Sequence, residues 1–120
     1  MEKEIFEQFV IESVKDLPQF FKDKMENISI IIEDFPSLQV QKQMKHGPYE
    51  LLGIYQGVPY RKRGFWYGNV MPDKIIIYQK PIENIAKTEP EIKALVRRVV
   101  MHEIGHYYGL SEQELRKAGV

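Results

Sequence analysis

The sequence predicts an α+β (mixed α/β) fold, in which a small mixed sheet packs on helices. Helical patterns occupy both ends of the chain, and short β-branched runs lie between them. The chain has 120 residues, of which 43% are hydrophobic, so there is enough apolar material for one core. We therefore expect a single domain that spans residues 1–120.

The N-terminal segment is predicted to be an amphipathic helix over Met1–Leu17. Pro18 ends this helix or opens a short second helix around Gln19–Met25. Apolar residues recur at helical spacing, and we expect all of them to face the core: Ile5, Phe6, Phe9, Val10, Val14 and Leu17.

The middle of the chain carries three predicted strands. Ile28–Glu33 is short and β-branched and predicts a largely buried strand, while Leu38–Lys45 fits a helical turn. Leu51–Tyr55 and Lys74–Gln79 predict two further strands. The stretch between them is rich in glycine and proline, which predicts a long loop or a hairpin.

The strongest helical signal covers Glu89–Tyr108. Thr88 or Glu89 can cap its start, Pro90 suits its first turn, and Gly109 suits the left-handed position after its end.

A short last helix is predicted to follow this turn. Ser111 and Glu114 have the spacing of a capping box, which places the helix start at Ser111 and its body over Glu112–Ala118.

Composition excludes several classes of function. Basic and acidic residues number 17 each, so no global charge steers the chain to a polyanion. Cysteine is absent, which excludes disulfides, thiol nucleophiles and thiolate metal sites. The apolar runs are too short to cross a membrane, and the charged N-terminus does not resemble a signal peptide. We expect no membrane partner and a cytoplasmic location.

His102, Glu103 and His106 form an H-E-x-x-H motif on the strongest helix. Four residues place the two histidines about 40° apart on one helical face, so both imidazoles can reach one ion. The apolar stripe of the helix runs into the same sector, so the motif is predicted to face inward. A bound cation would satisfy these polar groups, although ordinary helix residues in a surface pair are an alternative interpretation.

A third metal ligand is expected on the far side of Gly109. Glu112 returns six residues after His106, which is the spacing of the last ligand in H-E-x-x-H-x-x-G-x-x-H sites. Glu114 is the substitute candidate. An acidic residue in the first turn of a helix is also stabilised by the helix dipole and needs no metal.

The segment VVMHEIGHYYGLSEQEL resembles the small bacterial zincin-like metallopeptidases, also called minimal zincins, and so do LLGIYQGVP and MPDKIIIYQKPIE. The resemblance implies a compact zincin-like fold, with zinc on His102 and His106 and with Glu103 as the catalytic base. The acidic third ligand of the family falls on Glu112, where the family more often has Asp.

The predicted function is therefore a zinc-dependent metallopeptidase that hydrolyses peptide bonds with a zinc-activated water, Glu103 acting as general base. Peptides or proteins are the expected substrates. The oxyanion could be stabilised by a tyrosine, and the candidates are Tyr55, Tyr60, Tyr107 and Tyr108. By analogy with zincins, Lys74–Gln79 could be the sheet edge that holds the substrate, although the same run also suits a plain core strand.

Two other functions compete with this prediction. One is a zinc-containing regulatory or protein-interaction module, in which a protein partner completes the cleft. The other is nucleic-acid binding through the basic and aromatic run Arg61–Tyr67, for which a solvated basic loop is the simpler interpretation. Imidazole and carboxylate ligands also suit iron, cobalt, nickel or manganese, but the motif favours zinc.

Overall fold

The computed structural model describes residues 1–57 and 73–118. Three strands form one mixed sheet in the order β1-β3-β2: β1 Ile28–Glu33, β2 Gly53–Gln56 and β3 Asp73–Tyr78. β1 runs parallel to β3, and β2 runs antiparallel to it. The predicted mixed α/β fold with a small sheet is confirmed.

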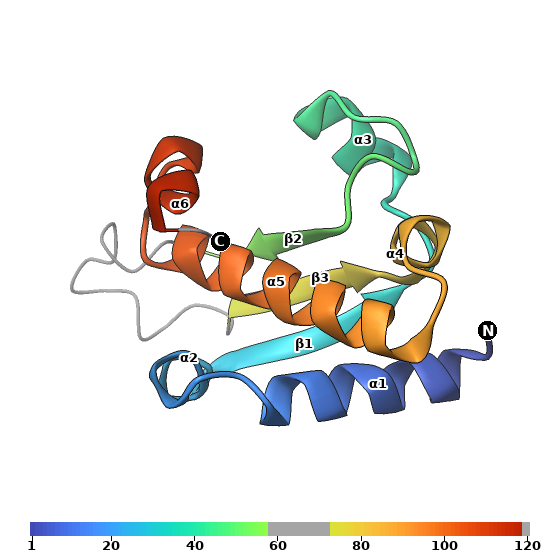
Figure 1. Ribbon diagram of the computed structural model, residues 1–120. Coiled ribbons are helices and arrows are strands. Elements are labelled where there is room, and N and C mark those ends of the chain that lie inside the picture. The colour runs from blue at the N-terminus through green and yellow to red at the C-terminus, as the bar shows by residue number, and fades with distance from the viewer. Residues whose placement is uncertain (58–72, 119–120) are drawn as a thin grey trace.

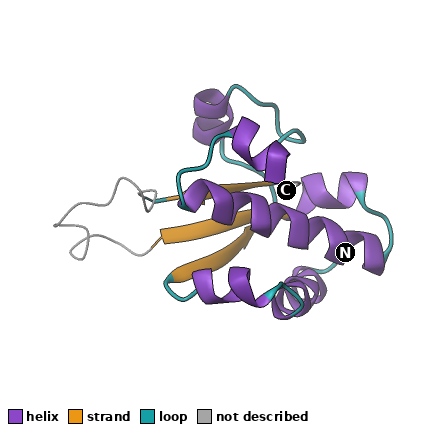
Figure 2. Ribbon diagram, turned by 60° about the vertical axis from the view of Figure 1, so that its left-hand side comes forward, coloured by secondary structure: helices purple, strands orange, loops and turns teal. Residues whose placement is uncertain are grey.

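Helices surround this sheet. Those in the described residues are α1 Lys3–Lys15, α2 Gln19–Lys24, α3 Leu38–Met44, α4 Gln79–Ile85, α5 Glu89–Tyr107 and α6 Glu112–Ala118. α5 lies along the sheet, with α1 beside it on the β1 side (Figures 1 and 2). α3 and α6 rise on the β2 side of the molecule (Figure 1). None of the helices in the described ranges is long and apolar enough to cross a membrane.

The core lies between the sheet, α1 and α5. Its fully buried side chains include Phe6, Ile75, Ile77, Ile82, Val96 and Val100. Each such side chain stabilises the fold by about 1.5–3 kcal/mol through removal of apolar surface from water. α5 contributes the largest share of helical core residues, so its orientation over the sheet is fixed by packing.

Most of the expected core face of α1 is confirmed. Phe6, Val10 and Leu17 are buried, and Phe9 and Val14 pack against the core at half-buried positions. The prediction for Ile5 is wrong, because its side chain is 49% exposed.

The buried face of α1 instead includes a polar residue. Ser13 takes a position between Val10 and Leu17, and its hydroxyl donates a hydrogen bond to the carbonyl of Phe9 at 2.7 Å. Helical spacing from Phe6 selects these positions and leaves Ile5 on the outer side.

Two expectations about strands are corrected by the sheet order. β1 is an edge strand rather than a largely buried one, since its residues alternate between half-buried and exposed and Ile31 is 37% exposed. β3 is the central strand, and Ile75 to Tyr78 are all buried. The zincin analogy that makes Lys74–Gln79 a substrate-facing edge is therefore wrong, and the alternative of a plain core strand is confirmed. β2 is the edge beside α5.

α4 is a helix that the sequence patterns did not predict. β3 ends at Tyr78, and Gln79 opens α4, with Pro81 in the first turn, where a missing N–H costs little. The buried Gln79 amide donates to the carbonyl of Met1 at 2.8 Å and to Glu83 at 2.7 Å. The amino group of Met1 donates to the same Glu83 carboxylate at 2.9 Å, so α4 anchors the start of the chain.

The helix ends that border the H-E-x-x-H motif follow the predictions. Thr88, rather than Glu89, caps α5 and forms a full capping box with Glu91. Gly109 has a φ of 80°, the left-handed conformation that glycine adopts without strain.

α6 begins with the predicted capping box, in which the Ser111 N–H donates to Glu114 and the Glu114 N–H donates to Ser111. The predicted long loop or hairpin and its Arg61–Tyr67 run lie in residues 58–72, outside the described part of the chain.

Candidate metal centre

Three candidate ligands converge at the junction of α5 and α6. Oε1 of Glu112 lies 3.2 Å from Nε2 of His102 and 2.9 Å from Nε2 of His106. The three donor atoms lie within 4.8 Å of one another. The two imidazoles therefore point to one place, and a carboxylate from the next helix meets them there.

Two glycines allow α6 to return to this position. Gly109 makes the reversal, and the N–H of Leu110 donates to the carbonyl of Gly105 at 3.0 Å. A Cβ atom at Gly105 would lie 2.1 Å from Cδ2 of Leu115, a fully buried residue of α6. The absence of a side chain within the motif thus permits the packing that carries Glu112 to the histidines.

Glu103 lies beside this cluster but points elsewhere. Its side chain is buried, and Oε1 accepts a hydrogen bond from the backbone N–H of Tyr55 on β2 at 2.8 Å. Burial raises the pKa of Glu103 to about 7, against the lowering effects of His102 and of the Tyr55 hydrogen bond. A carboxyl group with this pKa can both accept and return a proton near neutral pH.

Glu112 has the opposite electrostatic behaviour. Burial raises its pKa, but the hydrogen bonds and charges of His102 and His106 outweigh that effect and lower the pKa below its ordinary value. Glu112 is therefore held as a carboxylate, the form that ligates a metal.

Glu114, the substitute third ligand, is used differently. Its carboxylate accepts the N–H of Ser111 in the capping box of α6. The three-residue cluster in the described part of the chain includes Glu112 and not Glu114.

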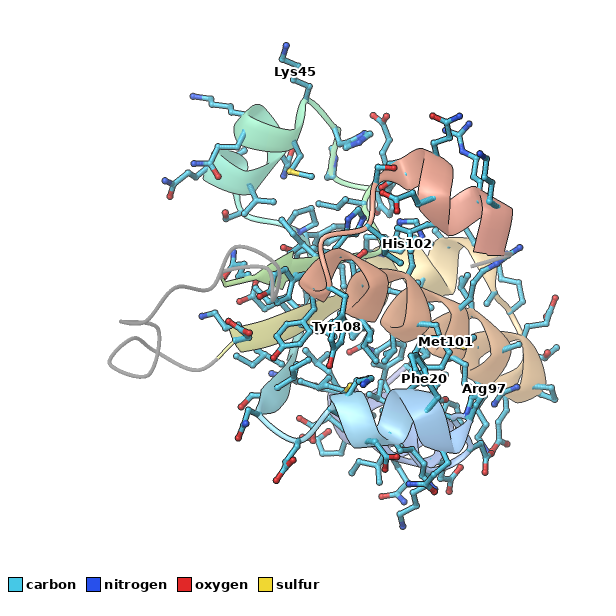
Figure 3. The ribbon with its side chains drawn as sticks, turned by 90° about the vertical axis from the view of Figure 1, so that its left-hand side faces the viewer. Phe20, Lys45, Arg97, Met101, His102 and Tyr108 are labelled. Atoms are coloured by element: carbon cyan, nitrogen blue, oxygen red, sulfur yellow. The ribbon has the colours of Figure 1, made fainter. Side chains whose placement is uncertain are left out.

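The cluster lies in a cavity of about 550 Å³ between α3 and α6, with β2 along one side. Figure 3 shows His102 on the α6 side of α5, with α3 across the gap. The lining residues other than the motif and Glu112 include Met44, His46, Leu51, Ile54, Tyr55 and Leu110. The cavity therefore combines an apolar wall with the polar cluster.

His46 is a cavity residue that the sequence analysis did not assign to the site. It follows α3, and its Nδ1 lies 3.6 Å from the Glu50 carboxylate. The contact between Glu103 and Tyr55 was also missed, because it joins residues 48 positions apart through a backbone N–H.

The three candidate oxyanion tyrosines in the described residues pack against one another. The Tyr107 ring is buried and lies edge-on to Tyr55 at 5.5 Å and to Tyr108 at 4.9 Å. Tyr108 also lies beneath the Lys24 ammonium at 5.2 Å. Tyr55 lines the cavity, whereas Tyr60 lies outside the described residues.

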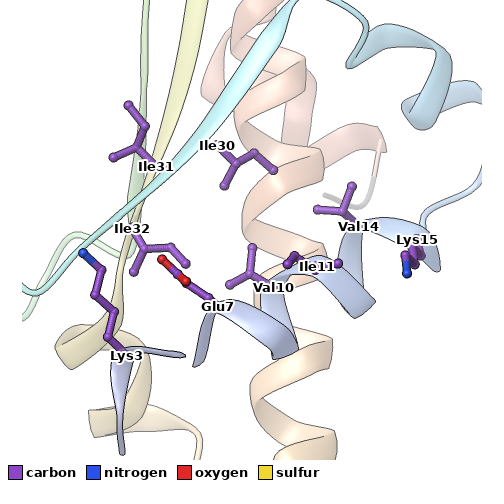
Figure 4. A pocket seen from close by; sticks show the side chains of 9 residues that line it. All are labelled: Lys3, Glu7, Val10, Ile11, Val14, Lys15, Ile30, Ile31 and Ile32. Atoms are coloured by element: carbon purple, nitrogen blue, oxygen red, sulfur yellow. The ribbon is translucent and has the colours of Figure 1, made fainter. Parts of the chain in front are cut away.

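Another cavity of about 550 Å³ lies between α1 and β1 (Figure 4). Its lining is mostly apolar, with Lys3, Glu7 and Lys15 around it. It shares no lining residue with the cavity at the candidate ligand cluster, and the histidine motif does not line it.

Comparison with known proteins agrees with the family resemblance. The sequence model of the zincin-like metallopeptidases matches residues 25–120, well over half of the chain, and the chain therefore belongs to this family. A conserved hypothetical protein from Thermus thermophilus has a similar fold, with a TM-score of 0.56, 20% sequence identity and a match that covers 98% of each chain. At that identity the likeness shows the fold alone. Comparison with curated proteins finds no match.

Proposed function

We propose that this protein is a zinc metallopeptidase, in which His102, His106 and Glu112 hold the ion and Glu103 is the general base. The observation that carries the proposal is the convergence of three donor atoms beside a buried carboxyl group whose pKa is raised to about 7. Peptides or proteins are the proposed substrates, in keeping with the family. We also propose that residues 1–120 act as one domain and that the protein works in the cytoplasm.

The donor set fits zinc. Two imidazole nitrogens and one carboxylate oxygen are typical of catalytic zinc sites, in which a fourth position stays open for water. A bound zinc ion would supply Lewis acidity and would lower the pKa of a bound water to about 7.

The chain itself supplies proton transfer and orientation. The Tyr55 N–H fixes one oxygen of Glu103, so the carboxyl group is held against β2 and the cavity instead of rotating freely. Burial keeps water away from the carboxyl group and holds its pKa close to neutral, which suits the transfer of a proton to a leaving amine. Glu103 therefore acts on protons while the neighbouring histidines act as ligands.

Metal content and turnover test the proposal together. We expect about one zinc per chain by mass spectrometry, lost in His106→Ala and in Glu112→Gln. Glu114→Gln is the matched control, because it changes a nearby acid of the same helix and should retain the metal. Glu103→Gln should retain zinc and lose cleavage of a peptide library by at least about 100-fold. A wild-type chain that takes up no zinc would contradict the proposal.

An interaction module is the second candidate function. α3 borders the cavity and exposes large apolar side chains, including Leu38 at 74% and Met44 at 43%. Such side chains suit contact with a protein partner that completes the cleft. A module of this kind would keep its affinity for the partner in Glu103→Gln, whereas a peptidase would lose turnover.

A further inference from the structure

A second hollow adjoins the metal cluster along α5. Its volume is about 310 Å³, at the small end of the range for ligand pockets, so it suits one residue better than a long segment. Its lining is mainly apolar and consists of Leu51, Leu52, Gly53, Leu95, Arg98, Val99, His102 and Glu103. It shares Leu51, Gly53, His102 and Glu103 with the larger cavity, so the two adjoin at the catalytic glutamate.

Arg98 is the cation of this apolar hollow. It lies four residues before His102, one helical turn earlier on the same side of α5. Its side chain is exposed, and no carboxylate in the described residues pairs with it.

The neighbouring cations of α5 are used within the fold. Arg97 lies 4.0 Å from Asp16, and Lys93 pairs with Glu12 and Glu89. A guanidinium that stays unpaired beside an apolar hollow fits a ligand carboxylate, which it can bind with two parallel hydrogen bonds.

The proposed proton transfer by Glu103 indicates which residue of a substrate would enter this hollow. Glu103 returns the proton to the leaving nitrogen, so the residue that carries that nitrogen lies on the Glu103 side of the scissile bond. The hollow includes Glu103 and His102 in its wall but neither His106 nor Glu112. Glu103 and His102 line the larger cavity as well, whereas His106 and Glu112 line only that cavity, so we assign the residue that carries the leaving nitrogen to the hollow.

The distance along the helix limits the length of that product. Four residues, about 6 Å along the helix axis, separate Arg98 from His102. A single residue spans about 3.3–3.6 Å, so one residue and the reach of the guanidinium account for this distance. An apolar side chain would then fill the hollow, and the carboxylate of the same residue would meet Arg98.

We propose that this protein is a carboxypeptidase, in which the hollow binds an apolar C-terminal residue and Arg98 pairs with its free α-carboxylate. This inference rests on the peptidase function proposed above. In the reaction the C–N bond before the last residue breaks, a hydroxyl from water joins the acyl carbon, and the remaining proton passes through Glu103 to the leaving nitrogen. Each cleavage releases one apolar amino acid.

Matched peptides test this proposal. The probes are acetyl-Ala-Ala-Leu with a free carboxylate and the same peptide with a C-terminal amide. We expect the zinc-loaded wild type to release leucine from the free acid, and to cleave the amide at least about tenfold more slowly. Arg98→Gln should remove this preference, whereas Arg97→Gln should keep it, because Arg97 lies on the α1 side of α5 (Figure 3).

Binding to metal-free protein separates the carboxylate contact from the chemistry. By NMR titration, the free acid should bind wild type and Arg97→Gln about fivefold more tightly than the amide does, and Arg98→Gln should bind both equally. Arg98 is exposed, so its replacement should leave the unfolding midpoint unchanged.

One result would refute the carboxypeptidase alone, and another would refute the peptidase function on which it rests. Equal cleavage of acid and amide, or cleavage at internal bonds alone, would refute the carboxypeptidase while leaving a peptidase. A preference in binding that depends on Arg98, without cleavage of any peptide, would support the carboxylate contact and refute the peptidase.

Discussion

Glu103 combines a buried position with an ionisable group that the proposed mechanism uses. Burial raises its pKa from 4.5 to about 7, so the charged form is disfavoured in the fold. The group has one backbone donor, from Tyr55, to offset the loss of water. The proposed general base is therefore a local cost to stability, which the rest of the core offsets.

The first prediction concerns the pH dependence of this cost in metal-free protein. Because the folded pKa lies above the unfolded value, the contribution of Glu103 to stability is fully present below about pH 4.5 and is lost as the pH rises through about 7. Glu103→Gln stays neutral and can still accept the Tyr55 hydrogen bond. We expect equal stability near pH 4, and a variant that is more stable at pH 8 by up to about 3 kcal/mol.

Urea unfolding at the two pH values measures this difference. Glu114→Gln is the control for a general effect of removing an acid, and it should show no comparable gain at pH 8. A Glu103→Gln variant that is less stable than wild type at pH 8 would show that burial does not disfavour the charged carboxylate.

At the scale of elements, the contact between α5 and α6 depends on Gly105. Gly105→Ala would place a Cβ atom against Leu115, and α6 would have to shift. We expect a loss of about 1–3 kcal/mol in unfolding free energy, together with weaker zinc binding because Glu112 moves with α6. Calorimetry of unfolding and of zinc titration measures both effects.

The double variant Gly105→Ala with Leu115→Ala tests the cause. If the clash is responsible, the two substitutions should not add, and the double variant should bind zinc more tightly than Gly105→Ala alone. Fully additive losses would indicate that helix backbone effects, rather than the clash, dominate.

The capping box of α6 supports the same ligand. Ser111→Ala removes the hydroxyl that accepts the Glu114 N–H, and we expect a loss of about 1 kcal/mol in stability. Ser111→Asp keeps an N-terminal capping side chain and should therefore retain most of the stability that Ser111→Ala loses. Thermal unfolding of the three proteins measures the change, and an unaltered Ser111→Ala would show that the box contributes nothing.

Local sequence signals predicted the helices and strands better than they predicted which strands pair in the sheet. Cap and turn residues such as Thr88, Gly109 and Ser111 act within a few positions, so the bounds of α5 and α6 could be predicted from sequence. The helix α4 could not be predicted in this way. Tyr78 provides no side-chain cap, and a proline such as Pro81 usually marks the end of a helix.

In the candidate site, too, features formed by residues close in sequence could be predicted, and those formed by distant residues could not. His102, His106 and Glu112 lie close in sequence, and their spacing predicted the convergence that the structure contains. The sheet order and the contact between Tyr55 and Glu103 depend on residues far apart in the chain, and hydrophobic periodicity carries no information about such partners.

At the scale of the whole molecule, zinc should stabilise the fold by mass action. A ligand that binds only the folded state at 100 times its dissociation constant adds about 2.7 kcal/mol. We expect the melting temperature to rise with added zinc and to fall again with a chelator. His106→Ala should show neither change, and an equal rise in that variant would place the bound ion elsewhere.

The three candidate ligands all come from residues 102–112, whereas the proposed base, Glu103, is held by Tyr55, which lies 48 residues earlier on β2. Closing a short loop costs less entropy than closing a long one. During folding, the three candidate ligands can therefore come together as soon as α5 and α6 meet, but Glu103 gains its hydrogen bond from Tyr55 only when β2 joins the sheet. In the proposed peptidase, the zinc ligands would therefore assemble before the proton-transfer group is in place, and a partly folded chain would hold zinc without hydrolysing peptides.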